Sequence, residues 1–273
     1  MSTSKKSVEG RPKGLLRAVS VVGSMTLLSR ITGLARDVSF SHWFGAGVTM
    51  DAFFIAFKIP NLLRRFFAEG AFSQAFVPVI SEYRTTRSPQ EIRELIDRVS
   101  GTLALILFVI TVLGVVSAPI LIMIFAPGFL DEGPRYGLAR DMLRFTFPYI
   151  FFISLTALCG AILNSYQKFA VPAFTPVFLN LVLIVFAGWV APDMARPAMG
   201  LAVGVFVAGV IQLTFQAIFL VRLKLLPRPR WGWAHDGVRK ILKLMGPVIF
   251  GSSVAQINIL FDTVVASFLA AGS

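Results

Sequence analysis

The sequence contains very few of the residues on which most catalytic and metal sites depend. Among its 273 residues there is one cysteine, Cys159, and there are two histidines, His42 and His235. A single cysteine excludes an internal disulfide and a cysteine-based metal cluster. Cys159 lies in an apolar run, which favours a packing role. The chain also lacks a glycine-rich phosphate loop, an HExxH or CxxC motif and an aspartate-rich prenyltransferase motif.

Charged residues are scarce as well. They make up 15% of the chain against 56% hydrophobic residues, whereas a soluble domain is about a quarter charged. We therefore predict an all-α fold, that of a polytopic helical membrane protein. The net charge is +12, but the basic residues flank apolar runs, as topology signals do. This placement argues against a nucleic-acid surface, and we expect no nucleic-acid partner.

The apolar runs predict about seven membrane spans, because about 20 residues are needed to cross ~30 Å of hydrocarbon. A capping box with proline at the first helical position, Ser88-Pro89-Gln90-Glu91, predicts a helix start before the third span. We expect a less regular or re-entrant piece at 69–78 and a polar loop at 131–140. The expected spans are 15–43, a second helix from 51 with a kink at Pro60, 99–125, 142–166 with a kink near Pro148, 174–190, 198–221 and 244–270.

The distribution of cations predicts the topology. Seven spans place seventeen lysines and arginines on the side of the N-terminus and four on the other side, so we expect a cytoplasmic N-terminus. We divide the chain into a cytoplasmic basic tail (1–14), an N-terminal lobe of six spans (15–225), and a cytoplasmic linker with the seventh span (226–273). Seven is an odd number for a transporter built from paired repeats, and we expect the sequence to be part of a longer protein with a second lobe.

The first two spans carry charges inside apolar sequence. A charge at a helix centre costs ~2.5–3.5 kcal/mol on insertion scales, so these groups are expected to face a water-filled cavity, pair with one another or lie near an interface. An excess of cations in such a cavity suggests an anionic substrate. The charged residues are Arg30, Arg36, Lys58, Arg64 and Arg65, with Asp37 and Asp51 as the anions.

Helical periodicity leaves several roles open. Arg30 and Asp37 are seven residues apart and share a helix face, so they form either a structural ion pair or part of a cavity. Glu69 is a candidate partner for an arginine or a cytoplasmic gate residue. Asp262 lies in the middle of the seventh span beside Thr263, where a carboxylate suggests either a functional site or a helix–helix hydrogen bond.

The motifs of the first two helices resemble those of the MurJ/MviN family, the lipid II flippases of bacterial cell-wall synthesis. The resemblance implies paired six-helix lobes with two extra helices, in the superfamily that also holds MATE-type exporters. On that reading the chain has the N-terminal lobe and the first helix of the second lobe. The motifs are Ser29-Arg30, Gly33-Leu-Ala-Arg36-Asp37, Phe44-Gly-Ala-Gly47, Asp51-Ala-Phe-Phe and the run PNLLRRFFAEGAFSQAFVP at 60–78, with further matches at 126–129, 146–149, 160–164 and 245–247.

The resemblance also assigns site residues. It implies that Arg30, Arg36 and Arg64 line a central cavity that takes the pyrophosphate and acidic headgroup of lipid II, and that Asp51 matches a functional carboxylate. The resemblance favours Arg64 over Arg65 as the cavity residue. We interpret Arg65 as interfacial, or as a gate or ion-pair residue together with Asp37 and Glu69. The position of Asp262 resembles a carboxylate that helps to bind sodium in some members.

These assignments lead to a specific hypothesis. We expect a flippase that is not an enzyme, in the bacterial cytoplasmic membrane, with lipid II, membrane lipids and the cell-wall synthesis machinery as partners. No cofactor is expected beyond coupling to a sodium ion or the membrane potential. Three alternatives stay open: another exporter of the superfamily that moves polysaccharide-linked polyprenyl lipids or drugs, a membrane enzyme acting on polyprenyl phosphates, and a scaffold of cell-wall synthesis.

Overall fold

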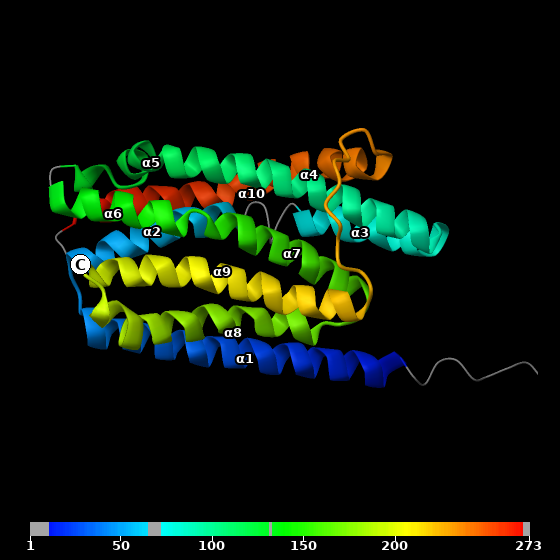
Figure 1. Ribbon diagram of the computed structural model, residues 1–273, viewed down its shortest axis with the longest axis horizontal. Coiled ribbons are helices and arrows are strands. Elements are labelled where there is room, and N and C mark those ends of the chain that lie inside the picture. The colour runs from blue at the N-terminus through cyan, green and yellow to red at the C-terminus, as the bar shows by residue number, and fades with distance from the viewer. Residues whose placement is uncertain (1–10, 65–71, 131–132, 270–273) are drawn as a thin grey trace, which may run out of the picture.

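The protein is a bundle of helices that run along one long axis (Figure 1). The computed structural model describes residues 11–64, 72–130 and 133–269, and every regular element in these ranges is helical, as the predicted all-α class requires. In chain order the elements are α1 (Arg11–Phe44), α2 (Val48–Arg64), α3 (Phe72–Thr86), α4 (Pro89–Val116), α5 (Ala118–Phe125), the 3₁₀ helix η2 (Pro127–Phe129), α6 (Gly133–Thr146), α7 (Tyr149–Ser165), α8 (Ala170–Val185), the π-helix η3 (Phe186–Val190), the 3₁₀ helix η4 (Ala191–Asp193), α9 (Pro197–Arg222) and α10 (Asp236–Ser267).

Local sequence signals set several helix boundaries as predicted. The Ser88 hydroxyl accepts a hydrogen bond from the Glu91 amide (3.3 Å), and the Glu91 carboxylate accepts one from the Ser88 amide (2.9 Å). This capping box starts α4 with Pro89 at the first position. At the tight turn between α1 and α2, Gly45 adopts a φ of 64°, a left-handed conformation that glycine adopts without steric cost.

Two predictions of irregular structure were wrong. The expected polar loop at 131–140 is helical from Gly133, because Arg135, Ala139 and Met142 are buried together at helical spacing. The expected irregular piece at 69–78 is regular helix from Phe72 onward. In α3 the apolar side chains form one buried stripe, which stabilises the helix even with Pro78 inside it.

Four helical stretches, α4, α6 with α7, α8 with η3 and η4, and α9, are long and apolar enough to cross a membrane. They are Pro89–Val116, Gly133–Ser165, Ala170–Asp193 and Pro197–Arg222, identified by length and composition among the described residues. They correspond to the predicted third to sixth spans. The other three predicted spans are not identified in this way. α2 is only 17 residues long, and the apolar part of α1 carries charged residues.

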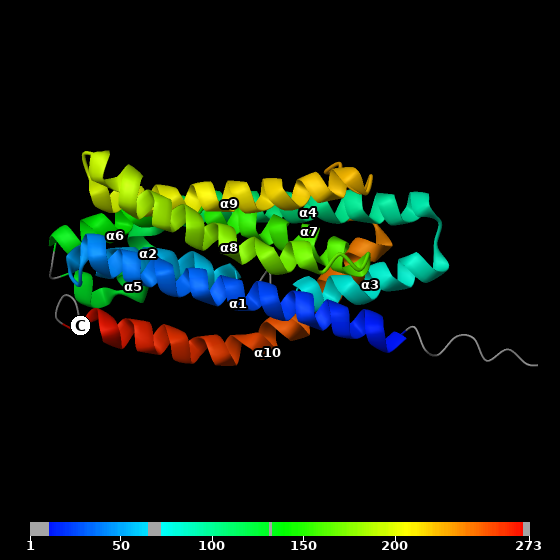
Figure 2. The ribbon, with the colours of Figure 1, turned by 90° about the horizontal axis from the view of Figure 1, so that it is seen from below.

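The connections between helices gather at the two ends of the bundle (Figures 1 and 2). The start of α1, the α3–α4 and α7–α8 turns and the segment between α9 and α10 lie at one end. The α1–α2, α5–α6 and α8–α9 connections lie at the other. This arrangement agrees with the alternation of sides on which the topology prediction depends.

The buried core has two apolar clusters with a polar layer between them. One cluster contains Phe53 and Tyr149, and the other contains Phe76 and Leu95. Along α7 and α9, buried polar residues separate the parts of each helix that belong to the two clusters. These polar residues are Ser154, Thr156, Gln212 and Gln216, joined by Thr175 of α8.

Candidate functional site

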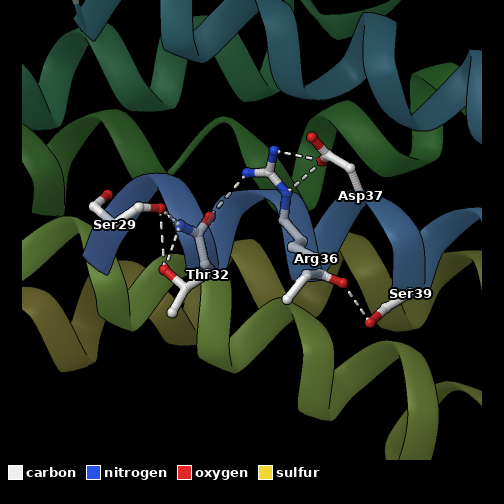
Figure 3. Close-up of polar contacts among 7 residues, drawn as sticks. Ser29, Thr32, Arg36, Asp37 and Ser39 are labelled. Carbon is white, nitrogen blue, oxygen red and sulfur yellow. Dashed lines mark hydrogen bonds and ion pairs between the residues drawn. The ribbon is translucent and has the colours of Figure 1, made fainter. Parts of the chain in front are cut away.

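Arg36 is held between α1 and α8 by two different polar partners (Figure 3). Its guanidinium donates two hydrogen bonds to the Asp37 carboxylate, from Nη2 (2.7 Å) and Nε (3.0 Å). Nη1 donates to Oδ1 of Asn180 on α8 (3.0 Å). The Arg36 side chain is 23% exposed and that of Asp37 is 58% exposed. The guanidinium is therefore fixed in orientation while one of its partners faces outward.

Asn180 fixes this contact from the α8 side. Its side chain is buried, and Nδ2 donates to the Ser29 carbonyl (3.0 Å) and to Oγ1 of Thr32 (3.2 Å). A Cβ atom at Gly33 would lie 3.5 Å from this Nδ2, so the helices approach closely at this turn. Asn180 was missed by the sequence analysis. It could have been identified as a side-chain amide in the middle of an apolar span, since such groups form hydrogen bonds between helices.

Arg30 does not form the ion pair that its spacing from Asp37 suggested. Asp37 is bonded to Arg36 instead, because the long Arg36 side chain reaches both Asn180 and its neighbouring carboxylate. Arg30 is exposed on α1. Within the described part of the chain, its guanidinium has no ion pair. It lies six residues before Arg36, roughly 9 Å along the helix axis.

Arg64 borders a partly open cavity of about 320 Å³ that is lined by both polar and apolar residues. Its Nε donates to Oδ1 of Asn61 (2.9 Å). Across the cavity, Gln212 and Gln216 donate to the carbonyl (3.1 Å) and hydroxyl (2.8 Å) oxygens of Thr175. The side-chain oxygen Oε1 of Gln216 has no hydrogen-bond partner among the described residues. Polar residues that also line the cavity are Ser73, Thr156 and Asn164.

The Arg36 and Arg64 sites share helix α8. Thr175 lines the Arg64 cavity, and Asn180 holds Arg36. Five residues separate them, roughly 7.5 Å along the axis of an α-helix. Both arginine sites therefore contact α8, but Arg36 does not line the Arg64 cavity, and a single cavity shared by the two arginines stays a prediction.

Asp51 lies in a partly buried ion pair that the sequence analysis did not predict. Its Oδ2 accepts a hydrogen bond from Nη2 of Arg135 on α6 (2.7 Å), and the two side chains are 17% and 4% exposed. The Arg135 guanidinium also stacks over the Phe129 ring (4.1 Å) and donates to the Leu269 carbonyl (3.3 Å). The sequence analysis predicts a loop at Arg135. Its spacing of four residues from Ala139 is typical of a buried helix face and was not recognised.

Small cavities lie on both sides of this ion pair. One of about 280 Å³ is lined by Asp37 and Asp51 together with apolar residues of α1 and α2. The other, of about 160 Å³, is lined by Asp51, Lys58 and Arg135 with residues of α10. Lys58 is half-buried there and adds a second cation beside the carboxylate.

The structure says less about the remaining predicted site residues, Arg65, Glu69 and Asp262. Arg65 and Glu69 lie outside the described residues. Asp262 is exposed on α10, next to the buried Thr263. In the ranges that the structure describes, no group of three or more histidine, cysteine, aspartate or glutamate residues lies together as a metal site would require. A sodium site at Asp262 stays a prediction.

Comparisons with known proteins indicate the family of the chain. Residues 40–273 match the sequence profile of the family described as lipid II flippase MurJ. A Vibrio cholerae protein named probable lipid II flippase MurJ is 49% identical over 268 residues, which cover 96% of this chain and 51% of that protein. A Burkholderia cenocepacia protein named lipid II flippase MurJ is 43% identical over 263 residues, covering 95% of this chain and 51% of that protein.

A solved structure is also similar. It is that of a lipid II flippase MurJ in an inward closed conformation, with a TM-score of 0.75 and 31% sequence identity. The match covers 92% of this chain and 51% of that one. The chain thus spans about half the length of the relatives that it matches. By its sequence and its fold, the chain belongs to the lipid II flippase MurJ family.

Proposed function

We propose that this chain forms the N-terminal half of a flippase that moves lipid II from the inner to the outer leaflet of the bacterial cytoplasmic membrane. The observation that carries the proposal is the oriented guanidinium of Arg36, held by Asp37 and Asn180 inside a helix layer. The substrate class is supported by the names of the relatives. The rest of the transport path would come from a second lobe.

Arginine suits the recognition of a diphosphate. Its guanidinium binds phosphate oxygens through two parallel hydrogen bonds and stays charged at any physiological pH. In the proposed complex a phosphate displaces Asp37, which is more than half exposed, while Asn180 keeps the guanidinium in place. Arg30 and Arg64 supply further positive charge for the second phosphate and the acidic headgroup.

We assign the Asp51–Arg135 pair a different role, that of closing one end of the path. It joins α2 to α6 and lies beside the end of α10. An ion pair buried this deeply would hold these elements together while the other end of the path is open. Arg65 and Glu69 are candidates for the corresponding contacts elsewhere along the path, whereas Asp37 borders the same cavity as Asp51.

Moving a lipid between leaflets breaks no covalent bond, so the proposal needs no nucleophile or general base. Transport would follow from rocking one lobe against the other around the arginine site. We propose a sodium ion near Asp262 or the membrane potential as the driving force. The N-terminus lies in the cytoplasm on this proposal, and the cell-wall synthesis machinery would take up the product.

Complementation tests the proposal directly. Cells depleted of their own flippase would receive the natural full-length gene or its Arg30→Ala, Arg36→Ala, Arg64→Ala or Asp51→Ala variant, with membrane levels measured for each. Arg144→Ala is the matched control, because Arg144 is an arginine of α6 that is 45% exposed and lines none of the three cavities described above. We expect rescue by the parent and the control, and no rescue by Arg36→Ala or Arg64→Ala at equal membrane levels.

Other outcomes would favour the alternatives. A well-expressed parent that does not rescue would indicate an exporter of another polyprenyl-linked sugar. Rescue by every variant would contradict the arginine site and would be expected of a scaffold. Loss of function in the control as well would point to a general requirement for positive charge.

A further inference from the structure

The segment between α9 and α10, residues 223–235, is an extended strap that docks on α4 (Figure 1). Prolines alternate with arginines in its centre, and since proline has no amide proton, only alternate residues there can donate. These alternate amides all point at α4. The bonds run from the amide of Arg228 to Oδ1 of Asp97 (2.7 Å), from that of Arg230 to the Asp97 carbonyl (3.0 Å) and from that of Gly232 to Oγ1 of Thr102 (3.2 Å).

Close packing fixes the strap against the helix. A Cβ atom at Gly101 would lie 2.3 Å from the Arg230 carbonyl oxygen, and one at Gly232 would lie 2.5 Å from Cβ of Arg98. Nη1 of Arg98 donates to the Trp231 carbonyl (2.6 Å). These contacts fix the backbone of the strap against α4, and so they also fix the positions from which its side chains extend.

Those side chains are two tryptophans and two arginines that face outward. Trp231 and Trp233 are 55% and 51% exposed, and their rings stack with centroids 6.0 Å apart and planes 10° apart. Arg228 and Arg230 are also exposed, and neither guanidinium forms an ion pair within the part of the chain that is described. Large apolar rings beside free cations on one ordered strap are not explained by packing within this chain.

The strap crosses α4 at the level where its sequence changes from charged to apolar. Arg98 is the last charged residue of α4, and the exposed apolar face of the helix begins at Leu105. Gly101, where the strap touches, lies roughly 6 Å before Leu105 along the helix axis. In a membrane this is the level of the lipid headgroups, where tryptophan is enriched.

We infer that the strap is a binding site for the headgroups of anionic phospholipids. The ring pair of Trp231 and Trp233 would lie at the boundary between headgroups and acyl chains. Arg228 and Arg230 would bind the lipid phosphates. Charge supports this ligand, because residues 222–243 contain seven lysines and arginines and a single aspartate. Each basic residue near an anionic membrane surface contributes about 1 kcal/mol, or roughly a fivefold change in affinity.

Lipid is favoured over an acidic protein partner by the position of the patch. The strap contacts Gly101 of α4, and the exposed apolar residues Leu105, Phe108 and Val112 follow at helical spacing on the same face of α4. A ligand that covers both must be apolar on one side and anionic on the other. This property is that of a lipid at the membrane interface.

Quenching of tryptophan fluorescence by brominated lipids tests the inference. The natural full-length protein would be placed in nanodiscs that carry bromine on either phosphatidylglycerol or phosphatidylcholine. The quenching that disappears in Trp231→Phe/Trp233→Phe belongs to the ring pair. We expect brominated phosphatidylglycerol to quench it preferentially, and Arg228→Gln/Arg230→Gln to weaken this preference by up to about 25-fold. The matched control is Arg93→Gln/Lys168→Gln, which removes two exposed cations outside the strap.

Every other result would overturn the inference. Equal quenching by the two lipids would place the rings in the bilayer without selectivity for anionic headgroups. Quenching by neither lipid would mean that protein covers the pair. An equal effect of the control would assign the preference to general surface charge. Gel filtration of each variant checks that it is folded.

Discussion

Two of the aspartate–arginine pairs among the described residues, Arg36–Asp37 and Asp51–Arg135, differ in nearly every physical respect. Arg36 and Asp37 are neighbours in sequence, with side chains 23% and 58% exposed. Asp51 and Arg135 come from helices α2 and α6, with side chains 17% and 4% exposed. The first pair is open on one side, whereas the second is enclosed by a phenyl ring and a carbonyl group.

The difference indicates which pair can bind a ligand. A partly exposed ion pair contributes about 0–1 kcal/mol, so a phosphate can replace its carboxylate at little cost. Removing one partner from a buried pair costs about 3–5 kcal/mol, because the other charge is left uncompensated. The Arg36 pair therefore fits a substrate site, and the Asp51 pair fits a fixed structural contact.

The largest expected effect is on the buried pair. Arg135→Ala removes the arginine bonded to Asp51 and should lower the free energy of unfolding by up to about 3–5 kcal/mol, the range for a fully buried pair. The measurement is denaturant-induced unfolding of the purified full-length protein in detergent. The double variant Asp51→Asn/Arg135→Gln leaves neither charge uncompensated and should recover part of the loss. A double variant as unstable as the sum of its two single variants would show that the pair has no coupling.

Asn180→Leu should have an intermediate effect. The substitution removes the acceptor of Arg36 and the donor to Ser29 and Thr32, while leucine keeps a similar volume. We expect a loss of about 1–3 kcal/mol, the usual cost of unsatisfied buried polar groups. The same unfolding assay measures it, and complementation should fail at normal membrane levels because Arg36 is no longer oriented. Full rescue by this variant would show that transport does not require Asn180 to orient Arg36.

Asp37→Asn should change stability less. Its partner keeps the hydrogen bond to Asn180, and the exposed pair contributes about 0–1 kcal/mol. Because a phosphate no longer has to displace a carboxylate from Arg36, the binding of inorganic pyrophosphate should become up to about fivefold tighter, in line with that energy. Isothermal titration of the purified full-length protein measures this affinity. Weaker binding in Asp37→Asn would mean that the carboxylate positions Arg36 rather than competing for it.

Sequence alone predicted most of the helical architecture, because its signals are local. The capping box at Ser88, the turn at Gly45 and the break near Pro148 each depend on a few adjacent residues. The helical state of residues 133–140 was missed because it does not depend on a local signal. Their charges suggested a loop, while the burial that makes them helical depends on packing against α2 and α9.

The candidate site was predictable only in part. The residues on α1 and α2 were identified from charges within apolar sequence and from the family resemblance. Their partners were not identified, because Asn180 and Arg135 lie 144 and 84 residues away from Arg36 and Asp51. Periodicity describes the faces of one helix and contains no information on which helix covers a given face. Periodicity also placed Arg30 and Asp37 on one face of α1, whereas Asp37 pairs with Arg36, whose long side chain reaches the neighbouring carboxylate.

Ionic strength should produce the smallest effect and distinguishes the two pairs without further substitutions of the site. The Debye length falls from about 10 Å at 0.1 M salt to about 3 Å at 1 M. Screening acts on exposed charges, so the stability difference between the parent and Asp37→Asn should shrink at 1 M salt. The difference between the parent and Arg135→Ala should change less, because this pair is less exposed, with side chains 4% and 17% exposed. Unfolding measured at both salt concentrations tests this. If the Asp51 pair were as sensitive to salt as the Arg36 pair, it would have to be open to water in solution and could not act as the fixed contact that closes one end of the path.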